Sequence, residues 1–156
     1  MAREHRYQIT TIWTGNRGTG TNGYRSYGRD HEISAEGKIA VLPGSSDPLF
    51  LGDRSRYNPE ELLVGSLSAC HMLWFLHLCS DAGIVVTSYR DEALGELTER
   101  AGGTGEFTRV TLRPHVTISD PSRVRDVAAL HAKAHELCFI ARSVKFPVEH
   151  EPTVES

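Results

Sequence analysis

The fold of this 156-residue protein is best indicated by the segment Tyr57-Asn-Pro-Glu-Glu-Leu-Leu-Val-Gly-Ser-Leu-Ser-Ala-Cys-His-Met-Leu73. Its first residues favour the start of a helix, because Asn58 is a preferred N-cap, Pro59 suits the first helical position, and the two acidic residues that follow complement the helix dipole. We predict a helix that begins here and runs to about Asp81, where Gly83 is suited to end it.

The predicted helix is apolar on nearly all of its faces. From Leu62 to Cys79 it contains no Asp, Glu, Lys or Arg, although serines and histidines interrupt it and acidic residues stand at both ends. It is marginal in length and too polar for a membrane span. A helix of this kind must be covered on every side, so we predict a long buried central helix in a protein without membrane contact.

Segments rich in β-branched residues or in alternating apolar residues predict strands on both sides of the helix. They are residues 7–13, 24–33 and 38–42 before the helix, and 84–97, 107–118 and 144–148 after it, with a second helix from about Asp120 to Leu137. Short antiparallel strands with few helices and no strand–helix–strand rhythm favour an α+β fold. The length predicts a single domain over residues 1–156.

Composition and charge disfavour several classes of protein. The chain has 17 basic and 20 acidic residues and a net charge of −3, so it has no basic excess for binding nucleic acid. The polar N-terminus, Met1 to Arg6, has no apolar stretch behind it, which predicts no signal peptide and a cytoplasmic location. A G-x-G-x-x-G pattern at Gly18, Gly20 and Gly23 is not followed by a helix, so we interpret it as a hairpin loop rather than a cofactor site.

The three cysteines indicate reduced thiols, because an odd number does not suit a secreted disulfide scaffold. Cys70 and Cys79 lie about 13.5 Å apart along one helix and on opposite faces, whereas a disulfide requires Cα atoms within about 7 Å. The intrachain pairs that remain are Cys70–Cys138 and Cys79–Cys138. We expect Cys79 to be a packed core thiol.

Several segments together resemble one protein family. The helix from Asn58-Pro59-Glu60 through Ala69-Cys70, the earlier segment Ser26-Tyr-Gly-Arg-Asp-His31, and the late Cys138 are similar in type and order to the OsmC/Ohr family, the osmotically inducible and organic-hydroperoxide-resistance proteins. The resemblance implies antiparallel sheets wrapped around a long buried central helix, in an intertwined homodimer.

The resemblance also implies a thiol peroxidase that needs no cofactor. Cys70 would attack an organic hydroperoxide and become sulfenic acid, and Cys138 would condense with it to a disulfide that a dithiol, such as a dihydrolipoyl group, reduces. Arg29 would steady the Cys70 thiolate, and Glu60 would orient that arginine. The residues around Arg29 depart from the glycine-rich surround usual in Ohr proteins, which leaves Arg25 as its competitor.

The spacing of Glu60 and Cys70 constrains these roles. They are ten residues apart, or about 15 Å along a straight helix, so Glu60 cannot touch the Cys70 thiol of its own helix. Either Arg29 spans much of that gap, or Glu60 comes from the partner chain of a dimer.

Two other functions compete with the peroxidase. His131, His135 and Cys138 lie at i, i+4 and i+7 of the second helix and, with Cys70, could provide four zinc ligands. His71 is adjacent to Cys70, but neighbouring helix residues point apart, so it is a poor base for that thiol. The alternative without catalysis is a ligand-binding or structural dimer of the same fold.

Overall fold

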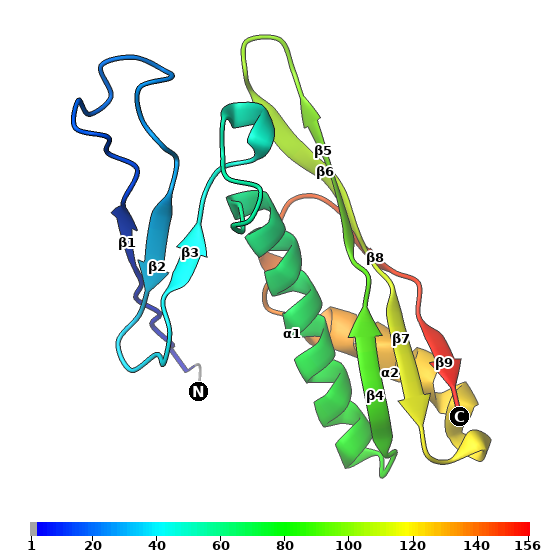
Figure 1. Cartoon of the computed structure of the whole chain (residues 1–156). Helices are drawn as coiled ribbons and strands as arrows, with labels where there is room; N and C mark the ends of the chain where they lie inside the picture. The colour runs from blue at the N-terminus through cyan, green and yellow to red at the C-terminus, as the bar shows by residue number, and fades with distance from the viewer. Residues whose placement is uncertain (1–2) are drawn as a thin grey trace. The chain divides into compact units, whose positions relative to one another are not determined.

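The computed structural model of the protein describes residues 3–156, and Met1 and Ala2 at the start of the polar N-terminus lie outside the described residues. The chain forms two compact units, an N-terminal unit (Met1–Leu62) and a C-terminal unit (Leu63–Ser156). Sheets combined with one long and one shorter helix confirm the predicted α+β class (Figure 1).

The N-terminal unit contains a three-stranded antiparallel sheet in the order β1-β2-β3, formed by β1 (Thr10–Trp13), β2 (His31–Ser34) and β3 (Leu42–Gly44). A short 3-10 turn, η1 (Pro48–Phe50), follows. The glycine-rich segment is a loop, as predicted, in which Gly18 and Gly20 have φ of 103° and 60°. The strand predicted over 24–33 begins only at His31, because the residues before it form the second half of that loop.

The central helix, α1 (Pro59–Asp81), confirms the predicted start and end. The backbone N–H of Glu61 donates to Asn58 Oδ1 (2.8 Å), and the backbone N–H of Asn58 donates to Glu61 Oε2 (3.1 Å), which is a reciprocal capping box. Gly83 has φ of 68°, the left-handed conformation that commonly follows a helix.

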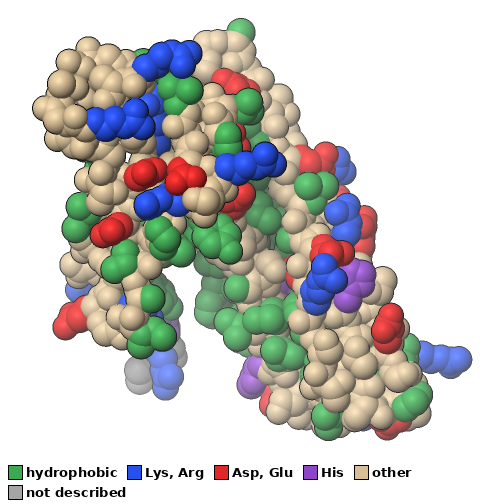
Figure 2. All heavy atoms as spheres, in the orientation of Figure 1, with side chains coloured by type: hydrophobic (Ala, Val, Ile, Leu, Met, Phe, Trp, Pro, Cys, Tyr) green, Lys and Arg blue, Asp and Glu red, His purple; other side chains and the backbone are tan. Residues whose placement is uncertain are grey.

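Within one chain, α1 is buried along one stripe and not on every side. Its buried residues, Leu67, His71, Phe75 and Cys79, recur at every fourth position, whereas Leu73 is 62% exposed. Figure 2 shows hydrophobic side chains gathered over this helix. By length and composition α1 could cross a membrane, but the core helix of a soluble protein has the same properties.

The C-terminal unit contains two three-stranded sheets. One has the order β4-β7-β9, formed by β4 (Val86–Asp91), β7 (Pro114–Ile118) and β9 (Thr153–Glu155). The other has the order β5-β6-β8, formed by β5 (Leu94–Glu99), β6 (Gly105–Leu112) and β8 (Val148–His150). The pairs β4·β7 and β5·β6 are antiparallel as predicted, whereas β8 and β9 pair in parallel with β6 and β7.

The second helix, α2 (Val124–Leu137), follows a 3-10 turn, η2 (Pro121–Arg123), whose cap is Asp120. Another short turn, η3 (Ala141–Ser143), leads to β8. The buried stripe of α1 packs against α2 and the sheets in two hydrophobic clusters. The first contains Phe75, Cys79, Ile84, Val116, Ile118, Val127 and Ala134, and the second contains Leu67, Val110, Leu112 and Val148.

Candidate active site

The C-terminal unit brings two of the predicted site residues together. Cys70 lies on α1 and is half-exposed, whereas Cys138 is the residue that caps the end of α2 and is 1% exposed. The Cys70 side chain is a hydrogen-bond partner of the Cys138 thiol, and the backbone N–H of Ala141 also donates to Cys138 Sγ (3.4 Å). Both cysteines are free thiols.

The environment of Cys138 keeps its thiol protonated. Burial first, and then the hydrogen bond with Cys70, raise the pKa of Cys138 to about 11, against a smaller lowering by backbone N–H groups. Cys138 is therefore a neutral thiol at neutral pH, and its S–H can donate toward Cys70.

Cys79 is the third cysteine, and the structure confirms it as a core thiol. It is 1% exposed and packs with Phe75 and Val127 in the first hydrophobic cluster. Burial raises its pKa to about 11, which keeps it protonated and unreactive.

Arg29 lies in the N-terminal unit, where its own loop holds its side chain. Its Nη1 donates to the carbonyl of Tyr27 (2.6 Å) and its Nη2 to the carbonyl of Tyr24 (2.7 Å). The guanidinium also lies over both tyrosine rings, 4.4 Å from the centroid of Tyr24 and 4.2 Å from that of Tyr27. Arg25, the competing arginine, is exposed on the same loop.

A buried polar network that the sequence analysis missed anchors the residue after Arg29. Ser45, which is 0% exposed, donates from Oγ to Asp30 Oδ1 (3.0 Å) and accepts from the backbone N–H of Asp53 (3.0 Å). Arg56 Nε lies 3.6 Å from Asp53 Oδ2. A serine in a turn-rich segment gives no pattern by which this contact could be predicted.

Glu60 occupies the first turn of α1 and is half-exposed. The capping role at this helix start belongs to its neighbour Glu61. Across residues 3–156, the recorded ion pairs include none between Glu60 and Arg29, whose guanidinium is engaged by its own loop. The role of Glu60, in its own chain or in a partner, therefore stays a prediction.

The zinc alternative is not supported. Among residues 3–156, no group of three or more His, Cys, Asp or Glu side chains is arranged to hold a metal ion. His131 Nδ1 instead faces His71 Nε2 at 3.0 Å, so that nitrogen is engaged by another imidazole. His135 instead packs against the His150 ring, with centroids 5.5 Å apart.

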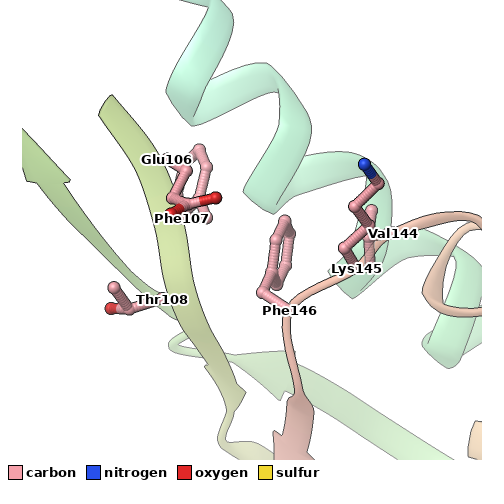
Figure 3. Close-up of a pocket in the computed structure, with 6 residues that line it drawn as sticks. All are labelled: Glu106, Phe107, Thr108, Val144, Lys145 and Phe146. Atoms are coloured by element: carbon pink, nitrogen blue, oxygen red, sulfur yellow. The ribbon is translucent and has the colours of Figure 1, made fainter. Parts of the chain in front are cut away.

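A separate open cavity of about 450 Å³ lies in the C-terminal unit. It is lined by Glu106, Phe107, Thr108, Val144, Lys145 and Phe146, and Figure 3 shows Phe146 projecting from the segment before β8. The rings of Phe107 and Phe146 have centroids 5.3 Å apart. Its lining includes no cysteine or histidine, so it is not the thiol site.

Comparison with known proteins identifies the family. The model of the family described as "OsmC-like protein" matches residues 52–153. The chain belongs to the OsmC-like family. The resemblance inferred from the helix motif is therefore confirmed.

Relatives extend the similarity over nearly the whole OsmC-like chain. An OsmC-like protein of unknown function from Vibrio cholerae is 31% identical, with a TM-score of 0.85, over 96% of this chain and 100% of that chain. The uncharacterized protein YmaD of Bacillus subtilis is 23% identical over 152 residues, which are 94% of this chain and 91% of YmaD. An organic hydroperoxide resistance protein from Elizabethkingia anophelis is 18% identical, with a TM-score of 0.66 and 99% coverage of both chains, and shares the fold.

Proposed function

We propose that this OsmC-like protein is a thiol-dependent peroxidase that reduces organic hydroperoxides to alcohols. The observation that carries the proposal is the pair of unequal thiols, in which half-exposed Cys70 meets buried, protonated Cys138. Family membership supports it, as do the names of proteins with the same fold from Elizabethkingia anophelis and Legionella pneumophila, both called organic hydroperoxide resistance proteins.

In the first step, the Cys70 thiolate attacks an oxygen of the hydroperoxide. An S–O bond forms and the O–O bond breaks, so that sulfur is oxidised to sulfenic acid and the alkoxide takes a proton from solvent to become the alcohol. The exposure of Cys70 gives the peroxide access to it, and the Cys138 thiol, the second reactant of the next step, lies beside it.

In the second step, the Cys138 sulfur attacks the sulfur of the Cys70 sulfenic acid. The S–S bond forms, the S–O bond breaks, and the hydroxyl leaves with the Cys138 proton as water. A dithiol reductant of the lipoyl type then restores both thiols by two exchanges and becomes a disulfide itself.

We assign Arg29 as the arginine of this site. A guanidinium beside a thiolate favours the anion and donates to the peroxide oxygens as charge develops. The Arg29 guanidinium is fixed by two hydrogen bonds to backbone carbonyls and by contacts with two tyrosine rings, whereas Arg25 is exposed. A side chain that is already fixed loses less conformational entropy when it binds, which supports Arg29 over Arg25. Glu60 would orient Arg29, either from the same chain or from a second copy.

The working form that we propose is an intertwined homodimer of a single domain, residues 1–156, in the cytoplasm. Support comes from α1, which is buried along one stripe although its other faces are also apolar. This dimer would bind the hydroperoxide and the dithiol, without nucleic acid, membrane or cofactor.

The test is consumption of cumene hydroperoxide with dihydrolipoamide as reductant. Cys70→Ser should lower the rate by at least about 100-fold, because it removes the nucleophile. Cys79→Ser is the matched control, since it also removes a helix thiol and should stay within about twofold of the parent. A Cys70→Ser protein as fast as the parent would overturn the proposal, and a parent without turnover would favour the ligand-binding or structural dimer.

Peptide mapping without reductant tests the resolving thiol. After one equivalent of peroxide we expect a Cys70–Cys138 bridge. A Cys79–Cys138 bridge, or no bridge, would refute the role given to Cys138.

A further inference from the structure

Two histidines form a hydrogen-bonded pair between α1 and α2. His71 Nε2 and His131 Nδ1 are 3.0 Å apart, and both side chains are 0% exposed. The ring planes differ by 4° and the centroids are 5.3 Å apart, so the rings lie nearly in one plane with nitrogen facing nitrogen. This is the geometry of an N–H···N bond in which one neutral imidazole donates and the other accepts.

The surroundings of the pair oppose its separation. In the described part of the chain, the second nitrogens of the two rings, His71 Nδ1 and His131 Nε2, are buried without a hydrogen bond. Phe75 stacks on the His131 ring, with centroids 3.9 Å apart and planes 7° apart, which fixes the orientation of that ring. A shift of α2 against α1 would break the shared bond and leave more buried nitrogens unpaired, which is costly.

The pair is neutral at the pH at which thiols react. Burial lowers the pKa of His71 to about 4, with smaller contributions from the charges of His150 and His135. The pKa of His131 is lowered to about 3, mainly by burial and to a smaller extent by the charges of His71 and His150. Two neutral imidazoles can share one proton, whereas two imidazolium ions would repel each other.

Each histidine is close in sequence to one of the two reactive thiols. His71 follows Cys70 directly on α1. Cys138 comes seven residues after His131, and seven residues make about 700° of helix, so both lie on one face of α2. The Cys70 side chain is the hydrogen-bond partner of Cys138. The two helices are therefore joined by an imidazole pair and by a thiol pair.

We propose that His71 and His131 are positioning residues for the disulfide step, which hold Cys138 on α2 within reach of Cys70 on α1. This inference rests on the proposed peroxidase. The Cys138 sulfur must meet the Cys70 sulfenic acid before a second hydroperoxide oxidises that sulfur to sulfinic acid. Holding two reacting groups together makes their reaction effectively unimolecular, so a fixed helix pair favours the disulfide over the sulfinic acid.

The test compares two substitutions at one position. In His131→Asn the side-chain amide lies near the place of Nδ1 and can still bond to His71, whereas His131→Leu keeps a comparable volume without any hydrogen bond. After peroxide is added, His131→Leu should form the Cys70–Cys138 disulfide about tenfold more slowly and accumulate more Cys70 sulfinic acid. Its sulfenic acid should form within about twofold of the parental rate, and His131→Asn should recover most of the disulfide rate. Intact-mass spectrometry of quenched samples measures all three species.

A control separates positioning from general stability. Val127→Ala removes buried volume one turn earlier on α2 and leaves the pair intact, so it should lower the melting temperature without slowing the disulfide. The inference is overturned if Val127→Ala slows the disulfide as much as His131→Leu does, or if His131→Leu keeps the parental rate. If His131→Leu does not fold, His131→Gln replaces it, because the glutamine amide is displaced by one methylene from that of asparagine. His131→Gln should form the disulfide more slowly than His131→Asn, and equal rates of disulfide formation would refute the inference.

Diamide, a thiol oxidant, separates this inference from the proposed function. It closes the Cys70–Cys138 disulfide without hydroperoxide and is itself reduced to the hydrazine. If the parent consumes no hydroperoxide, the proposed peroxidase activity is refuted. The rate of disulfide formation with diamide can still be compared between the parent and His131→Leu. A slower His131→Leu then supports the positioning role, and equal rates refute it.

Discussion

The two units of the chain bury different kinds of side chain. In the C-terminal unit, two hydrophobic clusters contain Leu67, Phe75, Val110 and Val127, all 0% exposed. Between residues 3 and 62, the core has no apolar side chain, and the buried polar residues there are Ser45 and Asn58. Several large apolar side chains of this unit are exposed instead, namely Tyr7, Ile9, Ile12, Trp13, Tyr24, Ile39, Val41, Leu49, Phe50, Leu51 and Tyr57.

The residues of the proposed site are held in place by different interactions in the two units. The two thiols are on helices fixed by apolar packing, which supplies most of the folding free energy. Arg29 is on a loop fixed by carbonyl bonds, tyrosine contacts and the Ser45 network. A three-stranded sheet needs a covered hydrophobic face to be stable, and every residue of β1 is exposed. In the homodimer proposed above, a second copy of the chain would cover the exposed apolar side chains of the N-terminal unit.

The largest loss of stability should follow from truncating a side chain in the hydrophobic core of the C-terminal unit. Leu67→Ala removes a fully buried side chain and leaves a cavity, so we expect a loss of roughly 2–5 kcal/mol in the free energy of unfolding. Ile39→Ala in the N-terminal unit is the matched control, because Ile39 is fully exposed and its change should stay within about 0.5 kcal/mol. Urea titration followed by circular dichroism measures both, and equal losses would remove the contrast between the units.

Acid should weaken the C-terminal unit through the imidazole pair. His71 and His131 have pKa values of about 4 and about 3 in the folded protein, below the ordinary value near 6.5 expected when unfolded. Between pH 6.5 and these lower values, the unfolded chain therefore binds more protons than the folded chain. The free energy of unfolding is at its full value above pH 6.5 and falls as the pH drops toward 4. The first proton alone should cost roughly 3 kcal/mol by pH 4.

A double variant isolates this titration from that of other groups. His71→Gln with His131→Asn replaces both imidazoles by amides that do not titrate, so its stability should fall less between pH 7 and pH 4. His135 and His150 face the pair and remain in both proteins, as do the carboxyl groups. The difference between the curves of unfolding free energy against pH for the parent and the double variant therefore measures the titration of the pair alone. If the stability of both proteins falls equally between pH 7 and pH 4, protonation of the pair does not contribute to the acid sensitivity.

The sequence predicts those parts of the fold that depend on local signals. The start of α1 follows from Asn58 and Pro59, and its end from Gly83, because caps act within a turn of the helix. The strand predicted over 107–118 divides at Arg113, whose backbone N–H donates to Asp91 Oδ1 (2.7 Å) rather than to a strand. The strand predicted over 144–148 lies at 148–150 instead, because its position is set by pairing with distant β6, and the final strand at 153–155 is set in the same way by pairing with β7.

The same distinction applies to the site. Cys70 and Cys138 follow from the family motif, and both thiols lie together as that motif implies. The imidazole pair escapes prediction because its members are 60 residues apart, and helical periodicity does not show which residue of another helix is opposite. The contacts of Arg29 are local, so the spacing of Tyr24 and Tyr27 around it is a signal that sequence reasoning could use.

A smaller effect should come from charging the exposed strand of the N-terminal unit. Ile12 on β1 is 54% exposed in the single chain, so Ile12→Glu would be nearly neutral if that face stayed in water. If a second copy covers it, a buried carboxylate should weaken dimerisation at least about tenfold, or roughly 1.4 kcal/mol. Sedimentation equilibrium measures the change, with Ile39→Glu as an exposed control. An unchanged dimer would place β1 outside the interface.

The smallest effect concerns Asn58, which belongs to the N-terminal unit but caps the helix that carries Cys70. Its side chain accepts from the backbone N–H of Glu61, and Asn58→Ala leaves that donor unpaired at a site only 6% exposed. We expect a loss of about 1 kcal/mol, and Asn58→Asp, which keeps the accepting oxygen, should lose much less. Because the cap acts at the helix start and the thiols lie further along α1, the rate of the Cys70–Cys138 disulfide should not change. A slower disulfide in Asn58→Ala would show that the thiol pair depends on the whole helix, and not on its packing against α2 alone.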